Sequence, residues 1–135
     1  MSKMPLVMLV DDFEDAREMY CSYLAFRGLQ VLCAEGGGQA IAYAREHRPD
    51  LILMDLRMPG VSGFEAMRTL RADPQFTKVP IVALTALALQ SERQAASTAG
   101  FDAVIAKPCL PDELFHIIAE LLAIWRPELG PLGHS

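Results

Sequence analysis

Five short apolar segments, separated by stretches with helical periodicity, constrain the fold of this chain more than any other feature of its sequence. The segments predicted to be strands are residues 5–10, 29–34, 51–54, 79–84 and 103–106. Each is too short for a helix, and continuous apolar character is typical of parallel strands covered on both faces. We therefore expect an α/β protein built on one five-stranded parallel sheet.

The stretches between these segments carry apolar residues at helical spacing. The predicted helices are residues 13–27, 39–47, 63–71, 89–99 and 111–125. In the first helix, one apolar stripe is predicted to face the sheet, and its members are Ala16, Met19, Tyr20, Tyr23 and Leu24. A run of glycines, residues 36–38, predicts a flexible turn before the second helix.

Right-handed crossovers between parallel strands leave few ways to arrange this alternation. Five strands favour the flavodoxin-like (βα)5 fold, with the sheet in the order 2-1-3-4-5 and helices on both faces. Residues 4–125 are expected to form this one domain, because 135 residues suffice for a single core. Residues 126–135, rich in Pro and Gly, are expected to be a C-terminal tail or a linker stub.

Polar side chains end four of the five predicted strands. Asp11 and Asp12 follow the first strand, Asp55 the third, Thr85 the fourth and Lys107 the fifth. These strands are neighbours in the order 2-1-3-4-5, so the five side chains are expected to share one pocket at the carboxyl edge of the sheet. Taken singly, each residue has an ordinary explanation as a cap, turn or loop residue. Their coincidence at one edge favours a functional site.

Three carboxylates in one pocket repel one another, which raises their pKa values unless a cation lies among them. A hard divalent ion with oxygen ligands and retained waters suits such a pocket, and Mg²⁺ is the expected ion. Lys107 adds a fixed positive charge and Thr85 a hydroxyl group, both of which would stabilise an arriving phosphoryl group. The predicted chemistry is nucleophilic attack by Asp55 to form an acyl phosphate.

The motifs at these strand ends resemble the receiver domain of two-component response regulators, the CheY-like family, over about residues 4–125. The resemblance is carried by Val10-Asp11-Asp12, by residues 53–60 (Leu-Met-Asp-Leu-Arg-Met-Pro-Gly) with Gly63, by Leu84-Thr85-Ala86 and by Ala106-Lys107-Pro108. It implies a signalling module that catalyses only its own phosphorylation and dephosphorylation. It also implies that the phosphate comes from a histidine kinase or a histidine phosphotransfer protein.

The resemblance further implies a role for each site residue. Asp12, Asp55 and the carbonyl of Arg57 would bind Mg²⁺ directly, with Asp11 acting largely through water. Thr85 and Lys107 would contact the phosphoryl oxygens, and the Lys107-Pro108 peptide corresponds to one that is cis in this family. A downstream protein would bind the face made by the fourth helix, the fifth strand and the fifth helix.

Three positions depart from the family pattern. Val104 stands three residues before Lys107, where receivers usually carry Tyr or Phe, and Cys109 follows Lys-Pro, where Phe is frequent. Arg57, two residues after Asp55, is a long cation where smaller or uncharged side chains are usual. These departures bear on the output switch and on the lifetime of the phosphate, not on the phosphoacceptor chemistry.

Other functions with an aspartate or a similar fold fit the sequence less well. A phosphatase of the haloacid dehalogenase type needs a second Asp two residues after the first, and Arg57 stands there. A flavodoxin-like cofactor binder needs a first loop that cradles phosphate, which Asp11 and Asp12 would repel. The preferred interpretation is a receiver with no output domain attached. Two alternatives keep the receiver fold: a docking module that acts without phosphorylation, and a receiver cut from a hybrid histidine kinase.

Composition narrows the possible partners. The formal net charge of −5 and the pI near 5.1 argue against a nucleic-acid-binding face, and no apolar run reaches the length of a membrane span. The N-terminus shows no signal peptide, so a cytoplasmic location is expected. The three cysteines, Cys21, Cys33 and Cys109, lack metal-ligand spacing and are predicted to be reduced thiols.

Overall fold

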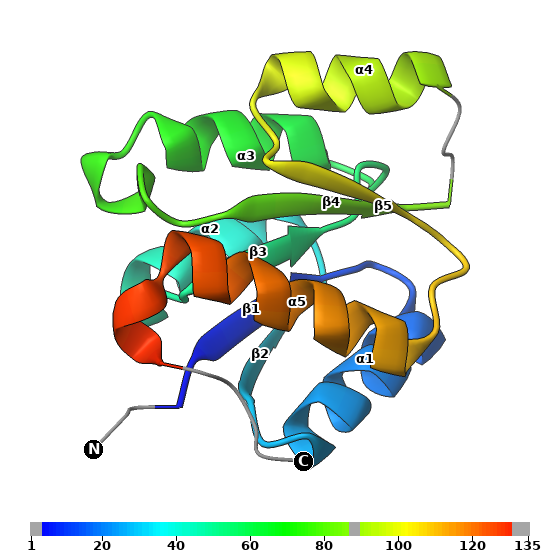
Figure 1. Cartoon of the computed structure of the whole chain (residues 1–135). Helices are drawn as coiled ribbons and strands as arrows, with labels where there is room; N and C mark the ends of the chain where they lie inside the picture. Colours follow the sequence, from blue (N-terminus) through cyan, green and yellow to red (C-terminus); the bar gives the residue numbers. More distant parts are fainter. Residues whose placement is uncertain (1–3, 87–89, 131–135) are drawn as a thin grey trace.

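The computed structural model describes residues 4–86 and 90–130 and confirms the predicted flavodoxin-like fold (Figure 1). One parallel sheet has the order β2-β1-β3-β4-β5. Its strands are β1 (Leu6–Val10), β2 (Gln30–Ala34), β3 (Leu51–Met54), β4 (Ile81–Thr85) and β5 (Ala103–Ala106). The helices are α1 (Glu14–Phe26), α2 (Gly37–His47), α3 (Gly63–Arg71), α4 (Gln90–Ala99) and α5 (Pro111–Trp125), with two short 3₁₀ helices, η1 (Pro74–Phe76) and η2 (Pro127–Leu129).

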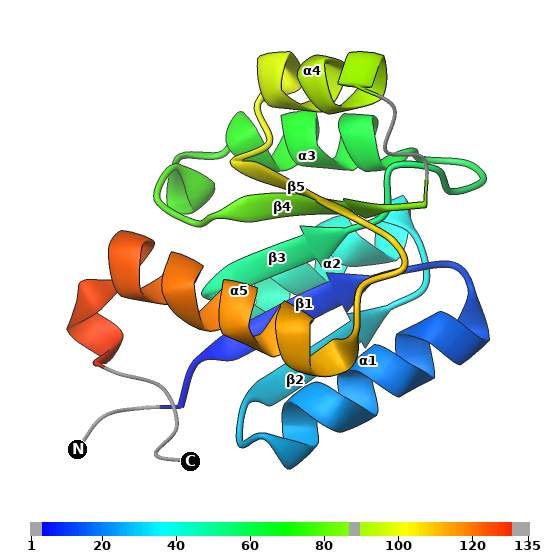
Figure 2. The same cartoon turned by 45° about the vertical axis from the view of Figure 1, so that its right-hand side comes forward.

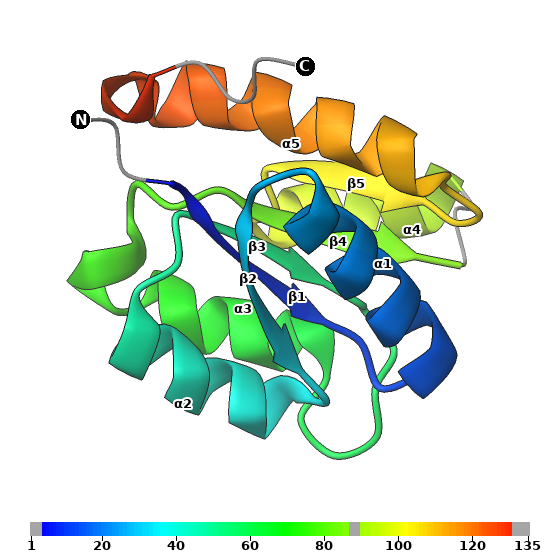
Figure 3. The same ribbon diagram turned by 90° about the horizontal axis from the view of Figure 1, so that it is seen from below.

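The core lies on both faces of the sheet. Successive residues of a strand point to opposite faces, so Met8 joins the cluster under α2, α3 and α4, whereas Leu9 joins the cluster under α1 and α5. Seen from below, α1 and α5 lie on one side of the sheet and α2 and α3 on the other (Figure 3). No helix within the described residues is both long and apolar enough to cross a membrane.

Helix α2 begins earlier than the glycine run suggested. Gly37 and Gly38 belong to the helix, so the predicted flexible turn is wrong for these two residues. Gly37 is buried against the loop after β3, where a Cβ atom would lie 2.4 Å from the carbonyl oxygen of Val61. The glycine is therefore needed for the close approach of that loop to α2, rather than for flexibility.

The predicted apolar stripe of α1 is only partly correct. Tyr20 and Leu24 are buried as expected, but Met19 is 47% exposed. The buried side of α1 runs instead through Tyr20, Cys21 and Leu24. The helix is thus rotated so that Met19 faces outward, near the site described below.

The prediction of three reduced thiols is wrong for two of the cysteines. Cys21 of α1 and Cys33 of β2 form a disulfide, with their Cα atoms 6.6 Å apart, and Cys109 is a buried free thiol. Packing of α1 against β2 brings the two cysteines together. The two cysteines are 12 residues apart in the sequence, on a helix and on the strand that follows it. That spacing alone does not predict that they lie close together.

The first residues of the predicted tail pack onto the domain. Arg126 pairs with Asp50 at 3.2 Å, and Leu129 of η2 contacts the cluster on the α1 and α5 side of the sheet. Residues 126–130 therefore contact the body of the molecule, and the domain boundary at residue 125 stays a prediction.

Candidate functional site

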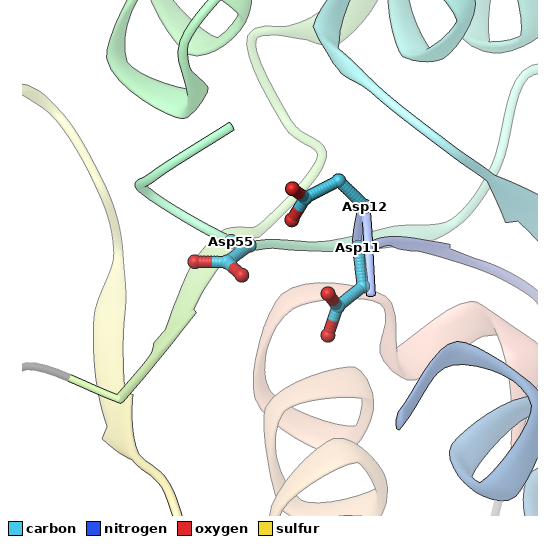
Figure 4. A group of neighbouring side chains, drawn as sticks. All are labelled: Asp11, Asp12 and Asp55. Carbon is cyan, nitrogen blue, oxygen red and sulfur yellow. The ribbon is translucent and has the colours of Figure 1, made fainter. Parts of the chain in front are cut away.

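The candidate site lies at the carboxyl edge of the sheet, directly beyond β1 and β3. The amide of Asp11 donates to the carbonyl of Ala34 at 3.1 Å, and the amide of Asp55 donates to the carbonyl of Val10 at 3.0 Å. These bonds continue the strand pairing by one residue on each strand. They hold the backbone so that the carboxylates of Asp11, Asp12 and Asp55 gather beyond the strand ends (Figure 4).

The three carboxylates form an oxygen-rich cluster. Each contributes one oxygen, and these atoms all lie within 4.8 Å of one another. Asp11 is buried with 1% exposure, Asp55 is half-buried, and Asp12 is exposed. Carboxylate oxygens at this spacing, with one side open to water, fit a hard divalent cation that keeps part of its hydration shell.

Lys107 supplies the positive charge of the pocket. Its ammonium donates to Oδ2 of Asp11 at 2.6 Å and lies 3.7 Å from Oδ2 of Asp55. Burial works to lower the pKa of Lys107, but the hydrogen bond and the charge of Asp11, followed by the charge of Asp55, raise the pKa overall. Lys107 is therefore a stable cation, held more closely by Asp11 than by Asp55.

The pKa of Asp55 is raised above its ordinary value of 3.8. Burial is the main cause, and the negative charges of Asp11 and Asp12 add to it. The backbone amide of Arg57, 3.2 Å from Oδ1, and the charge of Lys107 only partly offset these effects. A further cation in the pocket would stabilise the ionised form of Asp55.

Thr85 and Lys107 come from the neighbouring strand ends, as predicted. Thr85 is the last residue of β4 and is 1% exposed, and its carbonyl accepts a hydrogen bond from the amide of Lys107 at 2.8 Å. The Lys107-Pro108 peptide bond is cis. The structure thus places all five predicted side chains at one edge of the sheet, while residues 87–89 lie outside its described part.

Gly63 allows the start of α3 to pack closely against the backbone of Asp55. A Cβ atom on Gly63 would lie 2.1 Å from the carbonyl oxygen of Asp55 and 2.9 Å from the Cα atom of Leu56. Ser62 and Glu65 form a capping box at the start of α3, which satisfies amides of the first helical turn. The first turn of α3 is therefore packed directly on the backbone of Asp55.

Arg57 points away from the carboxylates, toward α4. Its guanidinium donates to Oε1 of Glu92 at 3.0 Å, and 66% of its side chain is exposed. Sequence reasoning missed Glu92 as a partner because 35 residues, including α3 and β4, separate the two. No local pattern signals a pairing of that kind.

Two residues of α1 support the site and were not predicted to do so. Arg17 donates to the carbonyl of Asp11 at 3.0 Å and also pairs with Glu35. The Tyr20 hydroxyl donates to the carbonyl of Cys109 at 2.8 Å, next to the Lys107-Pro108 segment. Their only signal in the sequence is their place one and two turns into the helix that follows Asp11 and Asp12.

A groove opens beside Asp55 between α1 and the segment after β5. Its volume is about 630 Å³, and its lining is mainly apolar. The lining residues are Phe13, Ala16, Met19, Tyr20, Asp55, Ala86, Lys107 and Pro108. Phe13 and Met19 are 62% and 47% exposed, which leaves an apolar surface next to the carboxylates.

Comparison with known proteins identifies the family. The family model of the response regulator receiver domain matches residues 7–119, which include the site and all of the sheet except Leu6. This chain belongs to the response regulator receiver family. Receiver domains are signalling modules of two-component systems and interact with histidine kinases and downstream partners.

Individual relatives agree with this assignment. The receiver is 36% identical over 102 residues to the polar-differentiation response regulator DivK of Brucella anthropi, and the match covers 76% of this chain and 83% of that protein. The chemotaxis protein CheY4 of Vibrio cholerae has a TM-score of 0.84 and 31% identity, and the match covers 89% of this chain and all of that one.

A third relative is a receiver that was solved with a metal ion. The receiver domain of the sensor histidine kinase PA1611 of Pseudomonas aeruginosa has a TM-score of 0.80 and 36% identity over 91% of this chain and 98% of that one. That structure has a magnesium ion coordinated in its active-site cleft.

Proposed function

We propose that this receiver is phosphorylated on Asp55 in a Mg²⁺-dependent reaction, with a histidine kinase or a histidine phosphotransfer protein as the phosphodonor. The observation that carries the proposal is the cluster of three carboxylates within 4.8 Å, with the Lys107 ammonium 3.7 Å from Asp55. A nucleophilic carboxylate, a site for a divalent cation and a fixed ammonium are the groups that phosphoryl transfer to an aspartate requires.

The three carboxylates would bind the metal in different ways, directly or through water, because their exposure and hydrogen-bond partners differ. Asp12 is exposed and Asp55 is half-buried, so both can be direct ligands together with the carbonyl of Arg57. Asp11 already accepts hydrogen bonds from Lys107 and from the amide of Phe13, which favours contact with the ion through water. Bound Mg²⁺ would neutralise the carboxylates and stabilise negative charge on the phosphoryl oxygens.

The transfer step follows from the positions of these side chains. A carboxylate oxygen of Asp55 attacks phosphorus, the phosphorus–nitrogen bond of the donor phosphohistidine breaks, and its electron pair remains on the imidazole. Lys107 and Thr85 would then contact the phosphoryl oxygens. Lys107 is 17% exposed and already lies between Asp11 and Asp55, so a small movement of its ammonium suffices.

We assign the phosphodonor to the groove beside Asp55. The exposed apolar side chains of Phe13 and Met19 offer a contact surface for a helix of the donor, and the groove leads directly to the carboxylate. The downstream protein would bind the separate face formed by α4, β5 and α5. The net charge of −5 favours protein partners over nucleic acid, and we place the protein in the cytoplasm, without membrane insertion.

We propose the same chemistry at Asp55 for a receiver, residues 4–125, that acts without an attached output domain. The alternative, a receiver cut from a hybrid histidine kinase, retains the same chemistry at Asp55. The size of the protein detected by antibody in its source cells distinguishes the two.

Phosphorylation with a small-molecule donor tests the proposal. Incubation with acetyl phosphate or phosphoramidate and Mg²⁺ should add one phosphoryl group, measured by intact-mass spectrometry. The added mass should be lost in Asp55→Asn and on chelation of the metal. Equal modification of Asp55→Asn would show that another residue accepts the phosphate, and a lack of modification in the wild type would favour a docking module that acts without phosphorylation.

A further inference from the structure

An ion pair between Arg57 and Glu92 connects the carboxylate site to helix α4. The backbone amide of Arg57 donates to Oδ1 of Asp55 at 3.2 Å, while its guanidinium donates to Glu92 in the first turn of α4 at 3.0 Å. Glu92 is the less exposed partner, with 25% of its side chain accessible against 66% for Arg57. One residue thus contacts both the phosphoacceptor candidate and α4.

Helix α4 has few other anchors. Ala96 is its one buried residue among residues 90–99, and α4 lies over α3 and β5 at the edge of the molecule in both side views (Figures 1 and 2). A cavity of about 190 Å³ remains between the loop after β3 and α4, lined by Leu56, Arg57, Phe64, Glu92 and Ala95. With so little apolar burial, an ion pair in the first turn contributes a larger share of the attachment of α4 than it would in a well-packed helix.

Strand β5, which contacts α4, carries no aromatic side chain. Val104 of β5 stands at the position where an aromatic side chain is typical of the family, and it is only half-buried. Its β-branched side chain is stiff and small, so a change in its position exposes or buries little surface. Arg57, by contrast, contacts Asp55 through its backbone amide and α4 through its side chain.

We propose that Arg57 is that contact: its guanidinium is held by Glu92 in the unphosphorylated receiver and moves to the phosphoryl group when Asp55 is phosphorylated. This inference rests on the proposed function. A phosphoryl group carries more negative charge than a carboxylate and presents several acceptor oxygens, so it competes well for a guanidinium whose backbone already contacts Asp55.

Competition between Glu92 and the phosphoryl group for the Arg57 guanidinium has two consequences. Loss of the bond to Glu92 releases the first turn of α4, which shifts the population toward a loosely held helix. Contact of Arg57 with the phosphoryl oxygens also crowds the approach of water to phosphorus, which lengthens the life of the acyl phosphate. Release of α4 and protection of the phosphate are therefore linked.

Amide hydrogen exchange tests the link to α4. In the unphosphorylated protein with Mg²⁺, Glu92→Gln should raise exchange of the α4 amides in residues 94–99 about two- to fivefold, because these amides are bonded within the helix and an ion pair of this exposure has a modest free energy. Beryllofluoride should produce a similar rise in the wild type and little further rise in Glu92→Gln, while residues 102–106 change little in either protein. Arg93→Gln, which removes a charge at the next position of α4, should behave as wild type.

The lifetime of the acyl phosphate provides a second readout that loosening of α4 alone would not reproduce. Glu92→Gln frees Arg57 for the phosphoryl group and should lengthen the half-life, whereas Arg57→Gln should shorten it. Both variants break the same ion pair, so half-lives that change in the same direction would overturn the proposal. Wild-type exchange in Glu92→Gln would overturn it as well.

Phosphoryl uptake, measured by intact mass on the same samples, separates this inference from the proposed function. If uptake is normal and the exchange and half-life effects are absent, Arg57 does not couple the site to α4 and the proposed function stands. If the wild type takes up no phosphoryl group, both are wrong.

Discussion

At the scale of single residues, the pocket holds more negative charge than its own cation can balance. Asp11, Asp12 and Asp55 face the single ammonium of Lys107, which is 2.6 Å from Asp11 and 3.7 Å from Asp55. Asp55, the proposed nucleophile, has the poorer access to that charge. An excess of negative charge of this kind favours binding of a cation, and it has measurable consequences for stability.

The raised pKa of Asp55 predicts that Asp55→Asn stabilises the metal-free protein at neutral pH. The pKa of Asp55 is higher in the folded protein than its ordinary value of 3.8, so the folded state binds this proton more tightly than the unfolded state does. As pH rises from 3.8 through the folded-state pKa, Asp55 loses the proton and the free energy of unfolding of the wild type falls. At pH 7 the variant should be more stable by about 1 kcal/mol, a common size for one site. Thermal unfolding in chelator should show this gain shrinking toward pH 4, and a gain that is independent of pH would contradict ionisation of Asp55 as its cause.

Asp11 and Asp12 should differ in their contributions to folding stability and to Mg²⁺ binding. Asp11→Ala leaves the Lys107 ammonium without its closest partner and should destabilise the fold by about 2 kcal/mol, since Asp11 is 1% exposed. Asp12→Ala changes an exposed side chain and should leave stability within about 0.5 kcal/mol while weakening Mg²⁺ binding more than Asp11→Ala does. Denaturant unfolding and Mg²⁺ titration measure the two effects, and equal losses of metal binding would show that both carboxylates contact the ion alike.

At the scale of elements, the spacing between α3 and the end of β3 depends on a missing side chain. Gly63 starts α3 at the point where its backbone meets the carbonyl of Asp55, and Gly37 lets Val61 of the same loop approach α2. The loop that follows Asp55 is therefore held between two helix starts. Its geometry comes from backbone contact rather than from side-chain packing.

Gly63→Ala should for this reason displace the loop that follows Asp55. An added Cβ atom would lie 2.1 Å from the carbonyl oxygen of Asp55, so we expect a loss of at least about 2 kcal/mol and slower phosphoryl uptake. Gly38→Ala is the matched control, because no atom lies within 4 Å of its added Cβ atom and alanine favours the helix by about 0.5–1 kcal/mol. Chemical denaturation and uptake rates compare the two, and equal stability of both variants would mean that the loop relaxes freely.

At the scale of the whole molecule, the parallel sheet gathers residues from four strands at a single edge. Binding of Mg²⁺ there should stabilise the entire domain, because the ligands come from segments far apart in the chain and the unfolded chain lacks the site. At a free Mg²⁺ concentration ten times the dissociation constant, the gain should be about 1.4 kcal/mol. Thermal unfolding with Mg²⁺ or chelator measures it, and a rise of the same size in Asp55→Asn would show that the ion binds elsewhere.

The sequence alone determined the fold and the members of the pocket. Apolar runs of strand length alternate with helical periodicity, and the handedness of crossovers then leaves the order 2-1-3-4-5. Because parallel strands end at the same edge, Asp11, Asp55 and Lys107 could be assigned to one place before any distance was known. Local pattern and general topology suffice for features that depend only on where strands end.

Tertiary structure alone decided which side chains meet. The pairing of Lys107 with Asp11, the contact of Arg57 with Glu92 and the disulfide of Cys21 with Cys33 depend on the rotation of helices about their axes and on the path of loops. The outward position of Met19 has the same origin. Helical periodicity defines a broad apolar face but not its orientation to within one residue, and ion pairs between distant segments leave no periodic trace, so packing of the complete chain decides them.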